Sequence, residues 1–270
     1  MLRAVQHKGM AFLSSELPTQ EPLLWLTALL VNGVLISLAQ RWPVLTRAGW
    51  CHAGLLGTVL WGSLGWRGWL AVVAYLVMGS LVTKLGFARK RDLGLAEARG
   101  GRRGPENVWG SAFTGLVLAM LVAAGLGSEP LLLIGFAASF AAKLADTFGS
   151  EIGKRWGRTT LLITTLRPVP AGTEGAVSVE GTLASALGSL LMTTVMALLG
   201  LLTTASSVVL VSVVGLVATL LESILGATGQ GRWPWLSNEL VNALQTAWAA
   251  LLAMAAAALL GGMTFGSIQP

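Results

Sequence analysis

Long apolar runs alternate with short polar segments along most of the chain. This pattern predicts an all-α, polytopic integral membrane helical bundle. Several runs approach the roughly 20 apolar residues that a helix needs to span a bilayer. Eight such segments are present, near residues 22–39, 51–65, 68–85, 108–126, 130–147, 178–203, 206–225 and 239–262. We therefore expect about eight transmembrane helices.

The number of spans depends on how the second and third runs are divided. Run 51–65 is short, and the Gly-Trp-Arg-Gly sequence at 65–68 that follows it is a weak break. The two runs can form separate spans, a bent pair or one long helix, because segment boundaries are the least certain part of a sequence reading. The range is therefore seven to nine spans.

The chain reads as one domain preceded by a tail. Residues 1–21 are polar, which predicts an N-terminal tail, and no Pro-rich or Ser-rich linker divides residues 22–270. We therefore expect a single polytopic membrane domain over 22–270. Its two longest polar segments are the loops 86–107 and 148–177.

The composition agrees with a membrane protein and narrows the chemistry. The chain is 54% hydrophobic and only 11% charged, whereas a soluble domain carries about 25% charged residues. The net charge of +6 is therefore read as membrane topology and anionic ligands, and no nucleic-acid partner is expected. The single cysteine excludes an internal disulfide, and the two histidines argue against a His-ligated zinc centre.

The charges are distributed unevenly between the polar segments. If successive spans alternate in direction, one face receives the loops 40–50, 86–107, 148–177 and 226–238. The basic residues of that face are Arg41, Arg47, Arg89, Lys90, Arg91, Arg99, Arg102, Arg103, Lys154, Arg155, Arg158, Arg167 and Arg232. The opposite face receives Arg3, Lys8 and Arg67. The positive-inside rule then predicts that the first face is cytoplasmic and that both termini lie on the opposite side.

Acidic residues also gather at the predicted cytoplasmic ends of the spans. Few polar residues fall at the midplane, where a transporter would need them. A site at the cytoplasmic interface fits this distribution better, because a soluble nucleotide and a lipid can meet there. The acids concerned are Asp146, Glu151, Glu174, Glu180 and Glu222.

Asp146 is the strongest candidate for chemistry. A carboxylate in a membrane helix is a functional-site candidate by default. Ser150 and Glu151 add oxygen donors of the kind that a hard cation prefers. An alternative is a structural ion pair, because Lys143 lies three residues before Asp146 and can share its helix face. The glycines after Asp146 favour the functional interpretation, since they leave room for a metal ion and phosphate.

Two glycine-rich loops are candidates for phosphate binding. The loop 99–107 reads RGGRRGPEN, in which glycines let backbone amides approach phosphate oxygens while arginines supply charge. It lacks the Walker A pattern, and a basic loop alone is also a topology signal. The segment 168–182 is too rich in Gly, Pro and Thr for a helix interior, and Ser178 is a plausible N-cap for the following span.

The last two spans add polar residues near the same face. Glu222 and Ser223 precede a glycine-rich turn, and Asn238 and Asn242 lie four residues apart on one face of the last helix. Buried amides in membrane helices often only join helices. Substrate contact is the alternative at this position.

These motifs, taken together, resemble a known family. They are LTRAGW at 45–50, GGRRGPENVWGSA at 100–112, ADTFGSEIGK at 145–154, LITTLRPVPAGTEGAVSVEGT at 162–182, ESILGATGQ at 222–230 and LSNELVNAL at 236–244. The family is the former domain-of-unknown-function membrane family that includes plant phytyl-phosphate kinase and an uncharacterised animal transmembrane branch. The D-T-x-x-S-E and G-T-x-G patterns also look distantly like those of CTP-dependent polyprenol kinases and CDP-diacylglycerol synthases.

The resemblance implies transfer of the γ-phosphoryl group of a nucleoside triphosphate, with CTP favoured, to an isoprenoid monophosphate in the membrane. The implied cofactor is Mg²⁺. The residues expected in catalysis are Asp146, Glu151 and Glu174, and those expected at the metal are Asp146, Glu151 and Glu222. Those expected at the nucleotide phosphates are Lys84, Arg99, Arg102, Arg103, Asn107, Lys154, Gly172, Thr173 and Gly175. Those expected at the acceptor are Ser150, Ser178, Glu180, Glu222, Ser223, Asn238 and Asn242.

The sequence also departs from the family pattern. Glu174, Glu222 and Glu239 stand where aspartate is expected, and Ala176 stands where glycine is expected. Each acidic exchange keeps the charge but lengthens the side chain by one methylene. Two rival functions stay open, a CDP-lipid-type nucleotidyltransferase and a non-enzymatic isoprenoid-phosphate carrier or flippase. The sequence leaves the oligomeric state open.

Overall fold

The computed structural model describes residues 22–265, with side chains for residues 22–261. The expected tail 1–21 and both chain termini lie outside the described residues. Apart from two short strands, the regular secondary structure of the described part is helical, which confirms the all-α prediction. Its helices are α1 (Pro22–Ala39), α2 (Arg47–Lys84), α3 (Phe87–Asp92), η1 (Ala98–Gly101), α4 (Pro105–Ala123), α5 (Glu129–Trp156), α6 (Val179–Leu198), α7 (Ala205–Gly229) and α8 (Asn238–Phe265).

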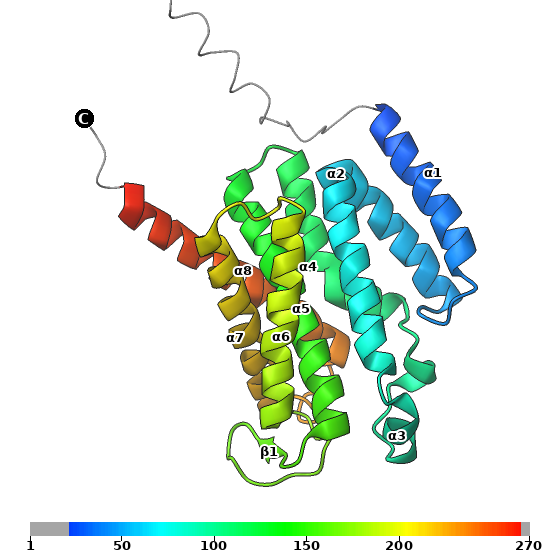
Figure 1. Ribbon diagram of the computed structural model, residues 1–270, viewed down its shortest axis with the longest axis vertical. Coiled ribbons are helices and arrows are strands. Elements are labelled where there is room, and N and C mark those ends of the chain that lie inside the picture. The colour runs from blue at the N-terminus through cyan, green and yellow to red at the C-terminus, as the bar shows by residue number, and fades with distance from the viewer. Residues whose placement is uncertain (1–21, 266–270) are drawn as a thin grey trace, which may run out of the picture.

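Seven of the described helices are long and apolar enough to span a membrane. The longest, α2, bends at Gly65, whose φ of +66° and ψ of −170° are not helical. Glycine is suited to this position because it has no Cβ to oppose a positive φ. The bend divides α2 into two arms that run in opposite directions (Figure 1). The second and third apolar runs are therefore a bent pair, and counting the two arms of α2 separately gives eight long helical segments in the described chain, within the predicted range of seven to nine.

Helix α5 forms the centre of the bundle. In the apolar stretch of α5, 72% of the residues are buried inside the bundle, whereas in that of α1 only 11% are. Small residues let the neighbouring helices approach α5 closely. A Cβ added to Gly149 of α5 would lie 2.1 Å from the Ser185 hydroxyl of α6, and one added to Gly215 of α7 would lie 3.2 Å from Ala141 of α5. The buried core includes Phe136, Phe140, Leu144, Met192 and Val211.

The long loops gather at one end of the bundle, at the bottom of Figure 1. Residues 148–156 of the expected loop 148–177 are helical, because α5 continues to Trp156. The remainder contains the antiparallel strands β1 (Leu161–Leu162) and β2 (Ala176–Val177). At the other end, Arg67 lies close to Gly200 in the turn between α6 and α7. The fold thus separates the basic loops from Arg67, as the alternating-span prediction requires.

Candidate functional site

A cavity of about 450 Å³ lies at the end of the bundle where the long loops gather. Helices α2 and α4–α8 and the two glycine-rich loops all contribute side chains to it. The predicted site residues that line it are Arg99, Arg102, Arg103, Asn107, Asp146, Ser150, Glu151, Lys154, Gly172, Thr173, Glu174, Gly175, Ser178, Glu222, Ser223, Asn238 and Asn242. Residues from both halves of the sequence therefore meet in one place.

Two predicted residues do not line this cavity. Lys84 is exposed at the end of α2. Glu180 lies in the first turn of α6, where its carboxylate accepts a 3.4 Å hydrogen bond from the Arg158 backbone amide. Ser178 caps that helix by accepting from the Gly181 amide, which fixes the first turn with Glu180 beside Arg158. The structure thus assigns neither residue to the cavity.

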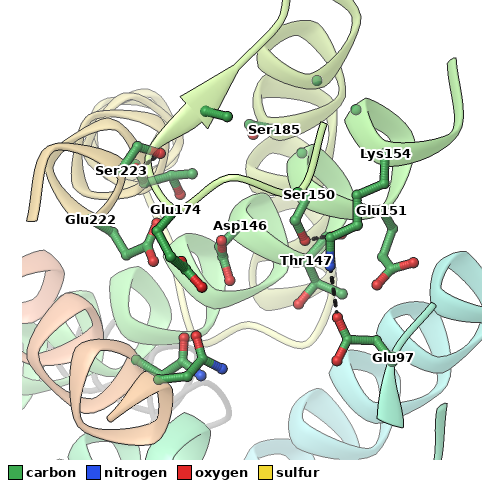
Figure 2. A pocket seen from close by; sticks show the side chains of 18 of the residues that line it. Glu97, Asp146, Thr147, Ser150, Glu151, Lys154, Glu174, Ser185, Glu222 and Ser223 are labelled. Carbon is green, nitrogen blue, oxygen red and sulfur yellow. Dashed lines mark hydrogen bonds and ion pairs between the residues drawn. The ribbon is translucent and has the colours of Figure 1, made fainter. Parts of the chain in front are cut away.

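Three carboxylates define one side of the cavity. Asp146 of α5, Glu174 of the second glycine-rich loop and Glu222 of α7 turn toward the same region in Figure 2. Gly175 makes this arrangement possible, because a Cβ there would lie 2.4 Å from the Ala227 Cβ. Its φ is +74°, which also favours glycine. The loop can therefore lie directly on α7 and hold Glu174 near Glu222.

Glu151 faces away from this acidic side. It lies five positions after Asp146, about 140° further round the helix at 3.6 residues per turn. Its carboxylate forms a buried ion pair with Lys90 of α3, and Lys90 also donates to the Thr83 carbonyl at 2.8 Å. The prediction that Asp146, Glu151 and Glu222 form one metal site therefore needs correction. Asp146, Glu174 and Glu222 are the carboxylates that converge.

One or two of these three carboxylates can serve as ligands of Mg²⁺, but the three together do not form a complete coordination shell. No described group of three metal-binding side chains is close enough to hold an ion by itself. The Asp146 carboxylate accepts from Lys143 at 2.5 Å, so the ion pair weighed as the structural alternative is present. Mg²⁺ usually keeps several waters and binds one or two carboxylates together with substrate phosphates. The donor set suits an ion that arrives with a nucleotide.

Cations define the other side of the cavity. The Arg103 guanidinium lies 5.6 Å from the centre of the Tyr75 ring and donates to the Tyr75 hydroxyl at 3.1 Å. Its backbone is held too, because the Arg103 amide donates to the Val44 carbonyl at 3.1 Å. Among the described residues, no carboxylate lies within ion-pair distance of Arg103. Arg103 is therefore a fixed cation available to a phosphate.

Lys154 and Arg99 already have acidic or amide partners, whereas Arg102 donates to the Arg99 backbone carbonyl at 3.1 Å. Lys154 forms a 2.9 Å ion pair with Glu97, and both residues appear in Figure 2. Arg99 contacts Glu106 and donates to the Asn107 side chain at 3.1 Å. Asn107 also accepts from the Gly104 amide at 3.0 Å, so it caps the start of α4. Glu97 accepts one of the three N–H donors of Lys154, so a phosphate group can bind Lys154 beside Glu97.

Comparison with known proteins identifies the family of this chain. The model of the integral membrane protein DUF92 family matches residues 30–250. The chain belongs to the DUF92 family of integral membrane proteins. This is the family that the sequence motifs resemble. No solved structure matches the chain.

Three relatives show how widely the DUF92 sequence is shared. An uncharacterized membrane protein of Synechocystis sp. is 47% identical, over 85% of this chain and 90% of its own length. The chloroplastic protein VTE6 of Arabidopsis thaliana is 38% identical, over 94% of this chain and 76% of its own. An uncharacterized membrane protein of Methanocaldococcus jannaschii is 30% identical, over 86% and 94%.

Two carboxyl groups in the loops of this DUF92 protein differ in their pKa. Burial raises the pKa of the Glu174 carboxyl; the attraction of Lys154 opposes this rise, and the nearby Asp146 and Glu97 add to it. Burial also acts to raise the pKa of Glu97, but Lys154 and Arg103 outweigh it, and that pKa lies below its ordinary value. Glu97 is thus held as an anion, whereas Glu174 takes up a proton more readily than an ordinary glutamate.

The sequence did not predict a site role for four charged residues in or beside the DUF92 cavity, Lys90, Glu97, Lys143 and Glu239. Lys90 belongs to a run of basic residues and carries no signal that separates it from its exposed neighbours. Glu97, Lys143 and Glu239 line the cavity, and the sequence indicated Lys143 only as a possible ion-pair partner of Asp146. A lysine within an apolar run is itself a signal of function. His52 Nδ1 accepts a 2.9 Å hydrogen bond from Trp109 Nε1, and His52 is not among the residues that line the cavity.

Proposed function

We propose that this protein is an isoprenoid-phosphate kinase. It transfers the γ-phosphoryl group of a nucleoside triphosphate, with CTP as the favoured donor, to phytyl monophosphate or a similar prenyl monophosphate. The observation that carries this proposal is the joining of three carboxylates and fixed cations in one cavity at the end of a membrane bundle. The motifs resemble those of plant phytyl-phosphate kinase, and a chloroplastic plant protein is 38% identical to this chain.

The proposed reaction needs charge compensation more than acid–base chemistry. An oxygen of the acceptor monophosphate attacks the γ-phosphorus, the bond from that phosphorus to the β-bridging oxygen breaks, and the nucleoside diphosphate leaves. The acceptor phosphate is already anionic at neutral pH, so no general base is required. The two anionic substrates repel each other, and cations that hold both are the main requirement. Arg103 and Lys154 supply such cations in the cavity.

Mg²⁺ is the cofactor that we propose, with Asp146, Glu174 and Glu222 as the residues that would hold it. When bound, it neutralises the phosphate oxygens on which charge develops. These carboxylates have the additional task of orienting the nucleotide relative to the acceptor. Asn238 and Asn242, which line the cavity from α8, are suited to contact the acceptor head group.

The lining of the cavity supports head-group binding and leaves the prenyl chain outside. Val177 and Leu220 are the only apolar side chains larger than alanine among the described lining residues. A prenyl chain gains little from such a polar wall, since its burial is favoured by apolar contact. We propose that the chain stays in the bilayer, beside the apolar outer faces of the helices, while the phosphate enters the cavity.

The test is a transfer assay on the full protein in detergent with Mg²⁺. γ-Labelled CTP and, separately, γ-labelled ATP are supplied with phytyl or geranylgeranyl monophosphate. We expect the label to appear in a lipid diphosphate. Release of diphosphate with the nucleotide retained on the lipid would instead identify a nucleotidyltransferase. Binding of the lipid by the folded protein with no transfer from either nucleotide would favour a carrier.

The raised pKa of Glu174 predicts how nucleotide binding depends on pH. The deprotonated carboxylate binds a metal ion, and the raised pKa means that this form is lost at a higher pH than for an ordinary glutamate. We therefore expect the stabilisation of the protein by Mg·CTP to fall as the pH drops through that raised pKa. The measurement is the shift in unfolding temperature that Mg·CTP produces, followed in steps as the pH is lowered from neutrality toward the ordinary pKa of a glutamate.

Glu174→Gln should bind Mg·CTP more weakly and lose most of this pH dependence. The matched control is Glu129→Gln, because Glu129 is exposed at the opposite end of α5. The control should behave as the unmodified protein. An unchanged pH dependence in Glu174→Gln would show that another group governs it.

A further inference from the structure

Lys143 occupies an unusual position for a charged residue. It lies about 21 Å along α5 from Glu129, at 1.5 Å per residue, and so about halfway through the spanning helix. Its side chain is only 8% exposed. Yet it lines the floor of the cavity. An ionisable residue at such depth is a functional-site hypothesis by default.

The ammonium group of Lys143 has more donors than the protein uses. It donates to the Asp146 carboxylate at 2.5 Å and to Asn242 Oδ1 at 2.7 Å. A lysine ammonium carries three N–H donors, and the described residues supply no further hydrogen-bond acceptor for it. One N–H donor of Lys143 is therefore left to contact a ligand at the floor of the cavity.

The two partners fix the ammonium between the two halves of the proposed reaction. Asp146 belongs to the carboxylate side of the cavity, and Asn242 comes from α8, where the acceptor head group is proposed to bind. Both line the cavity together with Lys143. A cation held between a proposed metal ligand and a proposed head-group ligand is in position to contact a phosphate that lies between them.

A purely structural role accounts less well for Lys143. Helix α8 is already joined to α5 one turn deeper, where Gln245 donates to the Ala142 carbonyl at 3.2 Å. The same Gln245 side chain donates to Thr219 of α7 at 3.2 Å. The side chain of Asp146 is 19% exposed and borders the cavity, so it does not require a lysine to be tolerated.

We propose that Lys143 is a phosphate-binding residue, whose third N–H donates to a phosphate oxygen at the floor of the cavity. The inference rests on the proposed function for the identity of the phosphate, but it concerns binding and does not require turnover. The ligand class is a phosphate or diphosphate group, carried either by the isoprenoid acceptor or by the soluble donor.

The test measures phosphate binding without Mg²⁺, so that metal binding at Asp146 does not enter. The protein in detergent with EDTA is titrated with inorganic diphosphate and, separately, with geranylgeranyl monophosphate in micelles. Lys143→Gln keeps an amide that can donate to Asp146 and Asn242 but removes the charge. We expect its affinity to fall roughly 10- to 100-fold in at least one arm, as for loss of a charge-assisted hydrogen bond. The arm that weakens identifies which substrate carries the phosphate.

Two further variants separate binding from folding. Arg89→Gln removes an exposed basic residue outside the cavity and should bind both probes as the unmodified protein does. Asp146→Asn should bind at least as tightly without Mg²⁺, because a repelling carboxylate is gone. Lys143→Gln/Asp146→Asn removes both charges together and should be weaker than Asp146→Asn by a similar factor.

Equal affinity in Asp146→Asn and in the double variant would overturn the proposal, because Lys143 would then only neutralise Asp146. An equal loss in Arg89→Gln would overturn it as well, since the effect would reflect net charge. Because neither probe undergoes reaction, these results are independent of the transfer assay. A failed transfer assay with intact lysine-dependent binding would reject the kinase and keep the phosphate site.

Discussion

Asp146→Asn is expected to abolish phosphoryl transfer while leaving the protein folded. The asparagine oxygen can still accept from Lys143, which also keeps Asn242 as a partner. The lost charge weakens binding of the proposed Mg²⁺, and such an ion stabilises the charge of a transition state by several kcal/mol. A loss of about 4 kcal/mol corresponds to a rate roughly 1000-fold lower. The measurement is the rate of label transfer, with the unfolding temperature measured in parallel.

The structural ion pair gives this experiment a matched control. If Asp146 served only to neutralise Lys143, then Lys143→Met/Asp146→Asn would restore activity, because neither charge would remain unpaired. In the proposed mechanism this double variant stays inactive. Recovery of transfer in the double variant, or full activity in Asp146→Asn, would remove Asp146 from the reaction.

Lys90→Met is expected to destabilise the protein by about 3–5 kcal/mol, the usual effect of breaking a buried ion pair. Lys90 is fully buried and Glu151 is 3% exposed, so the remaining carboxylate would lose its partner in a poorly solvated place. The methionine fills much of the space of the lysine stem. The change in unfolding free energy or temperature is followed in detergent by tryptophan fluorescence.

The double variant Lys90→Met/Glu151→Met should recover most of this stability. Replacing a buried pair with apolar side chains of similar volume is often neutral. Transfer activity in the double variant then tests Glu151 separately. A stable and active protein would make Glu151 an anchor for α3 alone, whereas a stable and inactive protein would return Glu151 to the chemistry. No loss of stability in Lys90→Met would contradict the importance of the buried pair.

The transmembrane fold was largely predictable because apolar length decides it. The short run 51–65 and the weak break at 65–68 left separate spans, a bent pair or one long helix open, and the bend at Gly65 decides for the bent pair. The end of α5 was misjudged, because the polar residues after Asp146 were read as loop. They remain helical to Trp156, since one side of this last stretch packs on α6 while the other faces the cavity.

The site was predictable to the extent that it lies at span ends. Asp146 and Glu222 lie near the ends of their apolar runs and Glu174 lies just before the next run, and alternation of the spans brings these positions to the same level. The sequence could not show toward which side of its helix each residue points. Glu151 was grouped with Asp146 because the two are close along the chain, although they point to different sides. The partnership of Lys90 with Glu151 depends on how α3 folds back, which no local pattern records.

The spacing of Lys143 and Asp146 has a consequence for how the protein is made. Most of the lining of the cavity comes from segments that follow α5, and Asn242 belongs to the last helix. While α5 enters the membrane, these later partners have not been synthesised. The i, i+3 pair lets the helix neutralise its own lysine at that stage. The charged floor of the cavity can thus be inserted as a nearly neutral segment and acquire its remaining partner when α8 arrives.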